Sequence, residues 1–212
     1  MLEAQDHRRL IKTHTPVDGI LYNPNSTYVV VHRDPRDVLF SLRNHMDNLK
    51  RIDYSLDPEE DVSALFREWV RTPASNDGGV QRSLEQIIIH FQSYKRFEQL
   101  ANIHMFHYAD LKANLPAAVA AMAGVLGVNV TAEDITEISR LADFKNMRDN
   151  AAQFAPLADD GLWKSNENFF NKGTSGQWRD VLNAEDLALY DERMSTLLPA
   201  EDIAWLHNGT SQ

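Results

Sequence analysis

Cysteine is absent from this sequence of 212 residues, and its absence excludes several kinds of site. A chain without cysteine has no disulfide framework, no thiolate zinc site and no cysteine nucleophile. The sequence also lacks any run of about 18 apolar residues, and its first residues lack the apolar core of a signal peptide. We therefore expect a cytoplasmic protein with no membrane partner.

Positive charge is scarce as well. The chain has 21 lysine and arginine residues against 31 aspartate and glutamate residues, so its net charge is −10. This balance disfavours a broad nucleic-acid surface, and a small anionic ligand would need a local basic pocket. The hydrophobic share of 43% and the charged share of 25% are those of an ordinary globular protein. The length predicts a single domain over residues 1–212.

Hydrophobic patterning predicts strands that alternate with helices. Apolar or β-branched segments predict strands at residues 9–14, 28–31 and 103–108. Residues 76–79 predict a loop, and residues 143–176 are mostly polar and irregular. Helices are expected at residues 35–48, 62–70, 83–100, 115–126, 132–141 and 184–197. The alternation favours the α/β class with a parallel sheet.

The stretch YVVVHRDPRDVLFSLRNH, residues 28–45, carries the first candidate site. Its apolar start predicts a buried strand, and Asp34 followed by a proline is typical of a helix start. Arg33 thus lies at the carboxyl end of a strand, where ligands bind in open α/β sheets, and Ser41 lies two turns into the helix. An arginine fork with a hydroxyl indicates a site for a phosphate or a carboxylate. The alternative is an ordinary helix start in which a neighbouring aspartate pairs with Arg33.

A second candidate site lies at Lys12 and His14, just before Pro16. Side chains alternate along a strand, so Lys12 and His14 would share one face. Histidine is the usual general base near neutral pH, and a lysine beside it can stabilise negative charge on a phosphate or sulfate oxygen. The alternative is a strand edge with ordinary polar residues.

Three further features could bind a nucleotide. The segment FFNKGTSGQW, residues 169–178, combines glycines, hydroxyls and Lys172 in a loop that could form a nest of backbone N–H groups around a phosphate. The rings of Tyr108 and Phe144 could each stack on a base, or could belong to the core.

The order of these segments resembles the sulfotransferases that use 3′-phosphoadenosine 5′-phosphosulfate (PAPS). The resemblance runs from about residue 9 to residue 199 and rests on five motifs, KTHTP, YVVVHRDPRDVLFSLRNH, FHYADLKANL, ADFKNM and FFNKGTSGQW. It implies a P-loop NTPase-like architecture, in which a parallel sheet is flanked by helices. It also implies PAPS as the co-substrate and 3′-phosphoadenosine 5′-phosphate (PAP) as the product.

The resemblance assigns roles to individual residues. It makes His14 the catalytic base and Lys12 its electrostatic partner. It places Tyr108 near the adenine and stacks Phe144 on the adenine ring. The 3′-phosphate is held in the family by residues that match Arg33, Ser41, Lys172 and Gly173.

Three departures from the family pattern affect these assignments. Asn171 stands where the family loop has an arginine, so one positive charge is missing. Ala142 and Asp143 replace a Thr-Ser pair before the stacking phenylalanine. Family members also begin with a strand and a Pro-Lys-Ser-Gly-type loop that cradles the 5′-phosphosulfate, whereas the first glycine here is Gly19. We therefore expect the fold without that N-terminal strand and loop, as in a truncated form or a natural remnant.

The predicted function is sulfuryl transfer from PAPS to a hydroxyl or amine of a small-molecule acceptor, without a metal. One alternative is an inactive remnant of the fold that binds a 3′,5′-bisphosphate nucleotide or a partner. A nucleoside-type kinase is a remoter alternative, which the KTH motif does not support. The acceptor and the oligomeric state stay open, although loops at residues 49–79 and 151–168 are the expected walls of the acceptor pocket.

Overall fold

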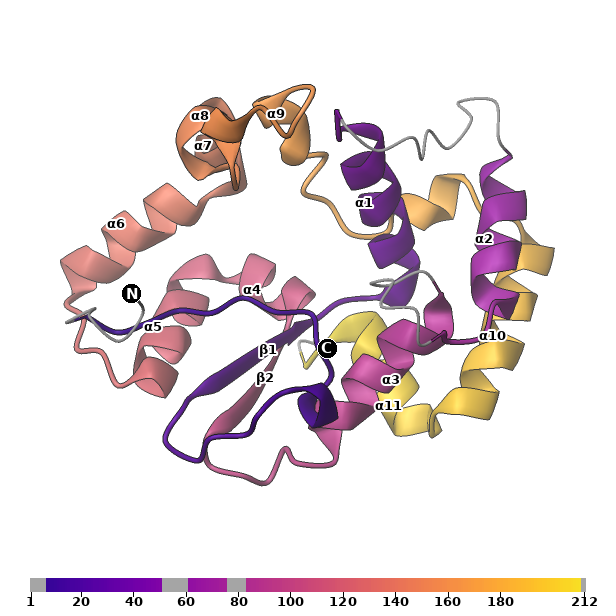
Figure 1. Ribbon diagram of the computed structural model, residues 1–212, viewed down its shortest axis with the longest axis horizontal. Coiled ribbons are helices and arrows are strands. Elements are labelled where there is room, and N and C mark those ends of the chain that lie inside the picture. The colour runs from indigo at the N-terminus through magenta and orange to yellow at the C-terminus, as the bar shows by residue number, and fades with distance from the viewer. Residues whose placement is uncertain (1–6, 51–60, 76–82, 211–212) are drawn as a thin grey trace.

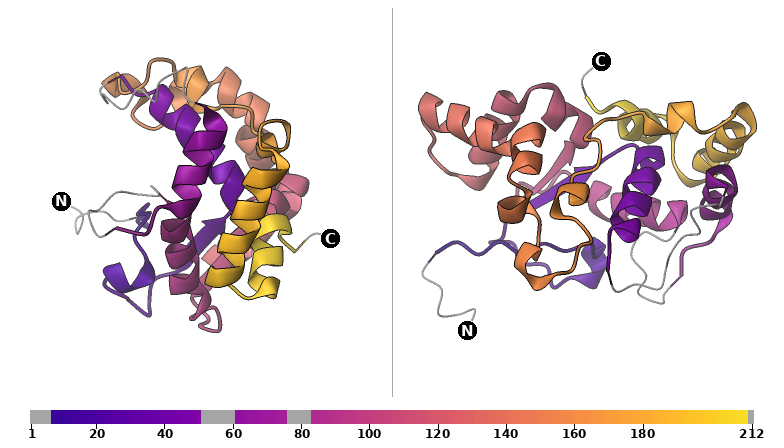
Figure 2. Two further views of the ribbon diagram at one scale, coloured as in Figure 1. Left: turned by 90° about the vertical axis from the view of Figure 1, so that its right-hand side faces the viewer. Right: turned by 90° about the horizontal axis from the view of Figure 1, so that it is seen from above.

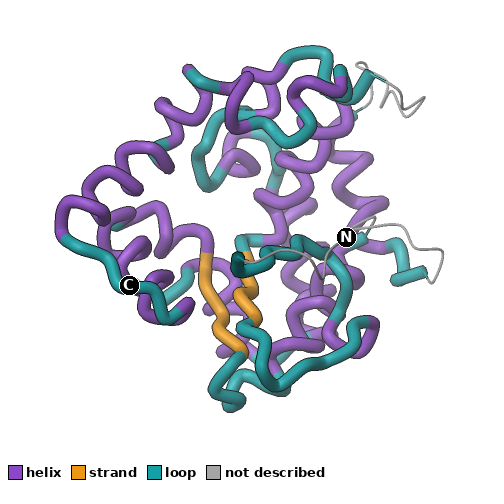
Figure 3. The backbone as a smooth tube through the Cα atoms, turned by 60° about the vertical axis from the view of Figure 1, so that its left-hand side comes forward, coloured by secondary structure: helices purple, strands orange, loops and turns teal. Residues whose placement is uncertain are grey.

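The computed structural model describes residues 7–50, 61–75 and 83–210 of the chain (Figure 1). At its centre, β1 (Tyr28–His32) and β2 (Ile103–His107) pair in parallel, with Tyr28 opposite Ile103 and His32 opposite His107. Helices flank this small sheet, and loops run past its lower end (Figure 3). The predicted α/β class with a parallel sheet flanked by helices is therefore confirmed. The loop predicted at residues 76–79 lies outside the described residues.

The described part of the first crossover, from β1 to β2, contains three helices with side-chain caps. They are α1 (Pro35–Asp47), α2 (Val62–Arg71) and α3 (Leu84–Lys95). The Asp34 side chain accepts a hydrogen bond from the Arg36 N–H at 3.0 Å, which satisfies one of the free donors at the start of α1. Asp61 and Ser83 cap α2 and α3 in the same way.

The chain after β2 is helical. Its elements are α4 (Tyr108–Ala113), α5 (Leu115–Leu126), α6 (Ala132–Ala142), α7 (Phe144–Asp149), α8 (Ala151–Phe154), α9 (Asn166–Phe169), α10 (Ala184–Leu197) and α11 (Ala200–Asn208). Three 3₁₀ turns complete the described structure, η2 (Val17–Gly19), η3 (Ala158–Asp160) and η4 (Gln177–Asp180). Within the described ranges, no helix has the length and apolar character needed to cross a membrane.

The main core lies where α1, α2, α3, α10 and α11 meet. Its fully buried side chains include Phe66, Phe91, Tyr190, Met194 and Leu206. Figure 2 shows α10 running alongside α2, and residues of these two helices are in contact. Burial of large aromatic and aliphatic side chains contributes about 1.5–3 kcal/mol each, so this cluster fixes how α1 and α3 are placed beside the sheet.

The sheet has its own smaller core. Val30 and Ile103 from the two strands pack with Val17 of η2 and Tyr94 of α3. Val31 points the other way and is 48% exposed, as alternation along a strand requires. Among the described residues, only one face of this apolar strand is therefore buried.

One predicted element is wrong, and some helices were not predicted. Residues 9–14 are extended but belong to no strand, and Leu10 and Ile11 are 94% and 78% exposed. A strand needs a neighbour for its backbone hydrogen bonds, and no described segment pairs with this one. Helix α11 was not predicted, and the mostly irregular stretch at residues 143–176 also contains the short helices α7, α8 and α9.

Candidate functional site

Arg33 lies in the turn between β1 and α1, at the carboxyl end of the sheet as predicted. Its Nη2 donates a hydrogen bond of 2.8 Å to the carbonyl oxygen of Thr174. The carbon of its guanidinium lies 4.6 Å from the centre of the Tyr108 ring, a cation–π contact. Its Nε is buried and has no hydrogen-bond partner among the described residues. A buried N–H donor without a partner is costly, so this atom is available to an incoming acceptor.

Asp37 fastens the glycine-containing loop to the first turn of α1. Its carboxylate is 1% exposed and accepts hydrogen bonds from the backbone N–H groups of Gly176 at 2.8 Å and Gln177 at 2.9 Å. Its Oδ2 also lies 3.5 Å from Nη2 of Arg33. Arg33 therefore pairs with a neighbouring aspartate, as the alternative interpretation expected, and it also contacts the loop. The role of Asp37 toward the loop was missed, since these partners lie far away in the sequence.

The loop itself comes into contact with the predicted stacking ring. Gly173 has a φ of +62°, and a Cβ built on it would lie 2.4 Å from a carbon of the Phe144 ring. Only glycine combines this left-handed backbone with such a close approach. The ring of Phe170 lies 6.4 Å from that of Phe144, edge to face. The ammonium of Lys112 donates to the carbonyl oxygen of Gly173.

The structure therefore brings together four of the six residues predicted to bind the nucleotide, which are Arg33, Tyr108, Phe144 and Gly173. The other two lie nearby in sequence but make no such contact. Lys172 is exposed next to Gly173, and Ser41 is half-buried in the middle of α1.

Lys12 and His14 lie in the exposed segment that precedes η2. This segment is tied to α3, because the Tyr94 hydroxyl donates to the Thr15 carbonyl at 3.1 Å and the Val17 N–H donates to Ser93 Oγ at 3.1 Å. Partial loss of solvent lowers the pKa of His14, and the positive charge of Lys12 lowers it further. The two side chains thus interact electrostatically although the predicted strand does not form.

Two more imidazoles lie within electrostatic range of His14. Burial is the main cause that lowers the pKa of His45, on α1, and the charges of Lys12 and His14 lower it further. Burial also lowers the pKa of His90, on α3, with a contribution from His14. Sequence reasoning missed both neighbours, because they come from helices that only the fold places beside the KTH segment.

His32 is an additional buried histidine, at the end of β1. Burial, followed by the neighbouring His90 and His107, lowers the pKa of His32 to about 3. Its ring packs edge-on against Phe91 at 5.2 Å and Trp205 at 6.2 Å. A buried neutral ring of this kind supports the strand end from which Arg33 projects.

Aromatic rings line the far half of α1. The His45 ring lies 4.8 Å from that of Trp163 and 5.9 Å from that of Phe169, and Phe169 contacts Phe170 at 5.2 Å. Since Phe170 also contacts Phe144, a row of rings runs from His45 to the loop at Gly173.

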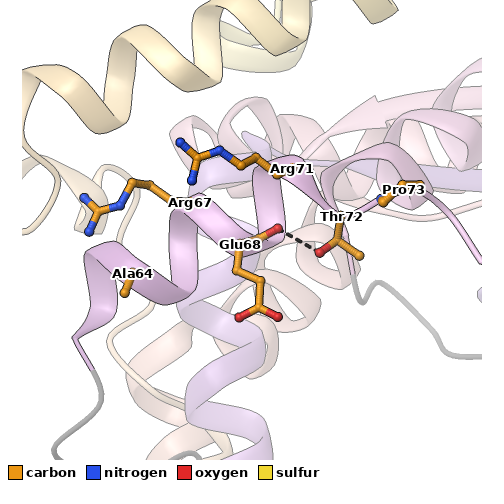
Figure 4. Close-up of a pocket in the computed structure, with 6 residues that line it drawn as sticks. All are labelled: Ala64, Arg67, Glu68, Arg71, Thr72 and Pro73. Carbon is orange, nitrogen blue, oxygen red and sulfur yellow. Dashed lines mark hydrogen bonds between the residues drawn. The ribbon is translucent and has the colours of Figure 1, made fainter.

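A shallow surface pocket lies elsewhere, along α2, and its lining residues are labelled in Figure 4. Two of the polar side chains there are engaged with other groups of the protein. Arg67 pairs with the buried Asp186 at 2.7 Å, and the Thr72 hydroxyl donates to the Glu68 carbonyl at 2.8 Å. Its lining residues fall within residues 49–79, one of the two segments expected to form the acceptor pocket, but none of the predicted catalytic or cofactor-binding residues lines it.

Comparison with known proteins connects this geometry to one family. The model of the sulfotransferase domain matches residues 1–202. A glycolipid sulfotransferase of Mycobacterium bovis (strain BCG / Pasteur 1173P2) is 30% identical over 239 residues, which cover 98% of this chain and 72% of that protein. An amine sulfotransferase of Oryctolagus cuniculus is 24% identical over 201 residues, which cover 90% of this chain and 61% of that protein.

Solved structures share the fold. Retinol dehydratase in complex with androsterone and the inactive cofactor PAP superposes with a TM-score of 0.67 at 23% identity, over 82% of this chain and 48% of that chain. A mouse sulfotransferase complexed with PAP gives a TM-score of 0.65 at 19% identity, over 84% of this chain and 60% of that chain. This chain thus spans about half the length of the first of these structures.

Proposed function

Because this chain belongs to the sulfotransferase family, we propose that it transfers a sulfuryl group from PAPS to a hydroxyl or amine of a small-molecule acceptor. One observation carries the proposal most directly. Arg33 lies over Tyr108 and donates to the loop whose Gly173 contacts Phe144. A cation against one ring and a glycine turn against another offer a phosphorylated adenine nucleotide partners for both its phosphate and its base.

The residues present fit PAP. The unpartnered Nε of Arg33 is a buried donor suited to a phosphate oxygen. We assign the 3′-phosphate to Arg33, Ser41, Lys172 and Gly173. Tyr108 and Phe144 would hold the adenine through their rings.

The residues of the KTH segment would act on the acceptor. PAPS supplies the sulfuryl group, and His14 accepts the proton that leaves the acceptor hydroxyl or amine. Since its pKa lies below the ordinary value, His14 is neutral at pH 7 and able to take up that proton. Lys12 would stabilise the negative charge that develops on the transferring group. The cysteine-free sequence supports placing this reaction in the cytoplasm.

The row of rings that begins at His45 supports an apolar part in the acceptor. Trp163 and Phe169 lie against His45, whose charge state responds to His14 and Lys12. The chain is similar to enzymes named for glycolipid and amine acceptors, and a hydroxyl or amine on an apolar carrier agrees with both.

Replacing Arg33 by alanine is expected to weaken PAP binding by about 1.5–3 kcal/mol, or roughly 10- to 150-fold. The variant loses the charged donor assigned to the 3′-phosphate, so adenosine 5′-phosphate should bind almost as it does to the wild type. Isothermal calorimetry with both nucleotides measures the difference.

Arg140→Ala is the matched control for this test. Arg140 is exposed on α6 and pairs with Glu137, so its loss should leave both affinities unchanged. An equal loss of PAP and adenosine 5′-phosphate binding in Arg33→Ala would remove the 3′-phosphate assignment.

A further inference from the structure

The loop assigned to the 3′-phosphate has less positive charge than its family counterpart. Asn171 stands beside Lys172 where the family motif has a second cation. A phosphate with two negative charges gains strongly from each nearby cation in a partly desolvated site. A loop with one cation would therefore bind it weakly, unless another element contributes positive charge.

Lys112 brings such a charge from α4. Its ammonium donates to the carbonyl oxygen of Gly173, the glycine that contacts Phe144. Arg33 donates to the carbonyl oxygen of the next residue, Thr174. Two cations from separate elements thus lie on consecutive carbonyl groups of the same loop.

Lys112 lies on the same face of α4 as Tyr108. Tyr108 and Lys112 are four residues apart in α4, so their side chains lie on the same face. Both side chains contact the candidate site: Tyr108 lies against the guanidinium of Arg33, and Lys112 donates to the carbonyl oxygen of Gly173. A helix that positions the ring predicted near the adenine therefore positions the ammonium as well.

The ammonium of Lys112 is not neutralised by its surroundings. Within the described residues it forms no ion pair with a carboxylate, and its residue is exposed. An ammonium has three donors and the Gly173 carbonyl uses one of them. Turning from a carbonyl oxygen to a phosphate oxygen would replace a dipole with a full negative charge.

We propose that Lys112 binds the 3′-phosphate of the nucleotide and supplies the positive charge that Asn171 does not. This inference rests on the proposed function, and it adds a binding residue to the same site. The ligand class is a nucleotide with a phosphate on its 3′ oxygen.

The test compares Lys112→Met with the wild-type chain by calorimetry. Methionine keeps much of the length and apolar character of the lysine stem but removes the charge. We expect PAP to bind about tenfold more weakly, the lower end of the range for a hydrogen bond to a charged group. Binding of adenosine 5′-phosphate should stay close to that of the wild type. Adding Asn171→Arg to the Lys112→Met variant should restore most of the PAP affinity, because it returns a cation to the loop.

Lys145→Met is the control for a general effect of charge. Lys145 follows Phe144 directly, but its side chain is 83% exposed and pairs with Asp149, so its removal should change neither affinity. An unchanged PAP affinity in Lys112→Met, an equal loss for both nucleotides, or no recovery with Asn171→Arg would each overturn the inference. If the wild type itself shows no preference for PAP, the proposed function is wrong. If only the Lys112 variants depart from the expected result, the assignment of Lys112 alone is wrong.

Discussion

Replacing His14 by alanine is expected to slow sulfuryl transfer by about 10²–10⁴-fold, the usual contribution of a positioned general base. PAP affinity should change little, because His14 lies in the exposed segment before η2 and is not among the residues assigned to hold the nucleotide. The measurement is the conversion of PAPS to PAP with a glycolipid and a phenolic acceptor, together with a calorimetric titration of PAP. His7→Ala, which removes another exposed imidazole, should leave the rate unchanged.

The pH dependence of the rate gives a second readout of the same assignment. His14 acts as a base only when it is neutral, so the rate should fall as pH drops through its pKa. Lys12 lowers that pKa, and Lys12→Met should therefore move the acid limb of the profile to higher pH. If PAP binding disappears together with turnover in His14→Ala, the base assignment is wrong.

Replacing Asp37 by alanine is expected to lower the free energy of unfolding by about 2–4 kcal/mol, because buried groups lose their partners. The Gly176 and Gln177 N–H groups lose their acceptor, and Arg33 loses its counter-charge. Since each kcal/mol shifts Tm by about 2–4 °C in a protein of this size, Tm should fall by roughly 4–16 °C. Thermal unfolding followed by circular dichroism or calorimetry measures this effect.

Asp47→Ala is the matched control on the same helix. Its side chain is 48% exposed and lies 3.9 Å from Arg43, so its removal should cost less than about 0.5 kcal/mol. Asp37→Asn nearly preserves the side-chain volume but removes the charge and one acceptor. It should therefore lower the free energy of unfolding almost as much as Asp37→Ala does. A stable Asp37→Asn variant would contradict the account of Asp37 as an anionic clamp on the loop.

Local patterns in the sequence predicted much of the fold. The β-branched run at Tyr28 and the Asp-Pro start after Arg33 predicted β1 and α1, and both formed. The strand predicted at residues 9–14 did not form, since a strand depends on a neighbour that local pattern does not reveal. Helix α11 is short and begins directly after Pro199, three residues beyond the end of the predicted helix at residues 184–197.

The candidate site was predictable where a motif carries the chemistry. The contacts of Arg33 with Tyr108 and of Gly173 with Phe144 unite residues that the family resemblance had assigned to one nucleotide. Asp37 was beyond prediction as a clamp, because its loop partners are 139 and 140 positions away. The same is true of Lys112, which reaches a loop 61 positions further along the chain. Such contacts are decided by how helices pack, and a periodic pattern does not encode them.

The central claim is that this chain binds a 3′-phosphorylated adenine nucleotide at the corner formed by Arg33 and the loop at Gly173. The most direct measurement is calorimetric titration of the wild-type chain with PAP and, separately, with adenosine 5′-phosphate. Our account predicts that PAP binds at least about tenfold more tightly, since the 3′-phosphate adds charge-assisted hydrogen bonds. Equal affinities, or no binding of either nucleotide, would contradict it.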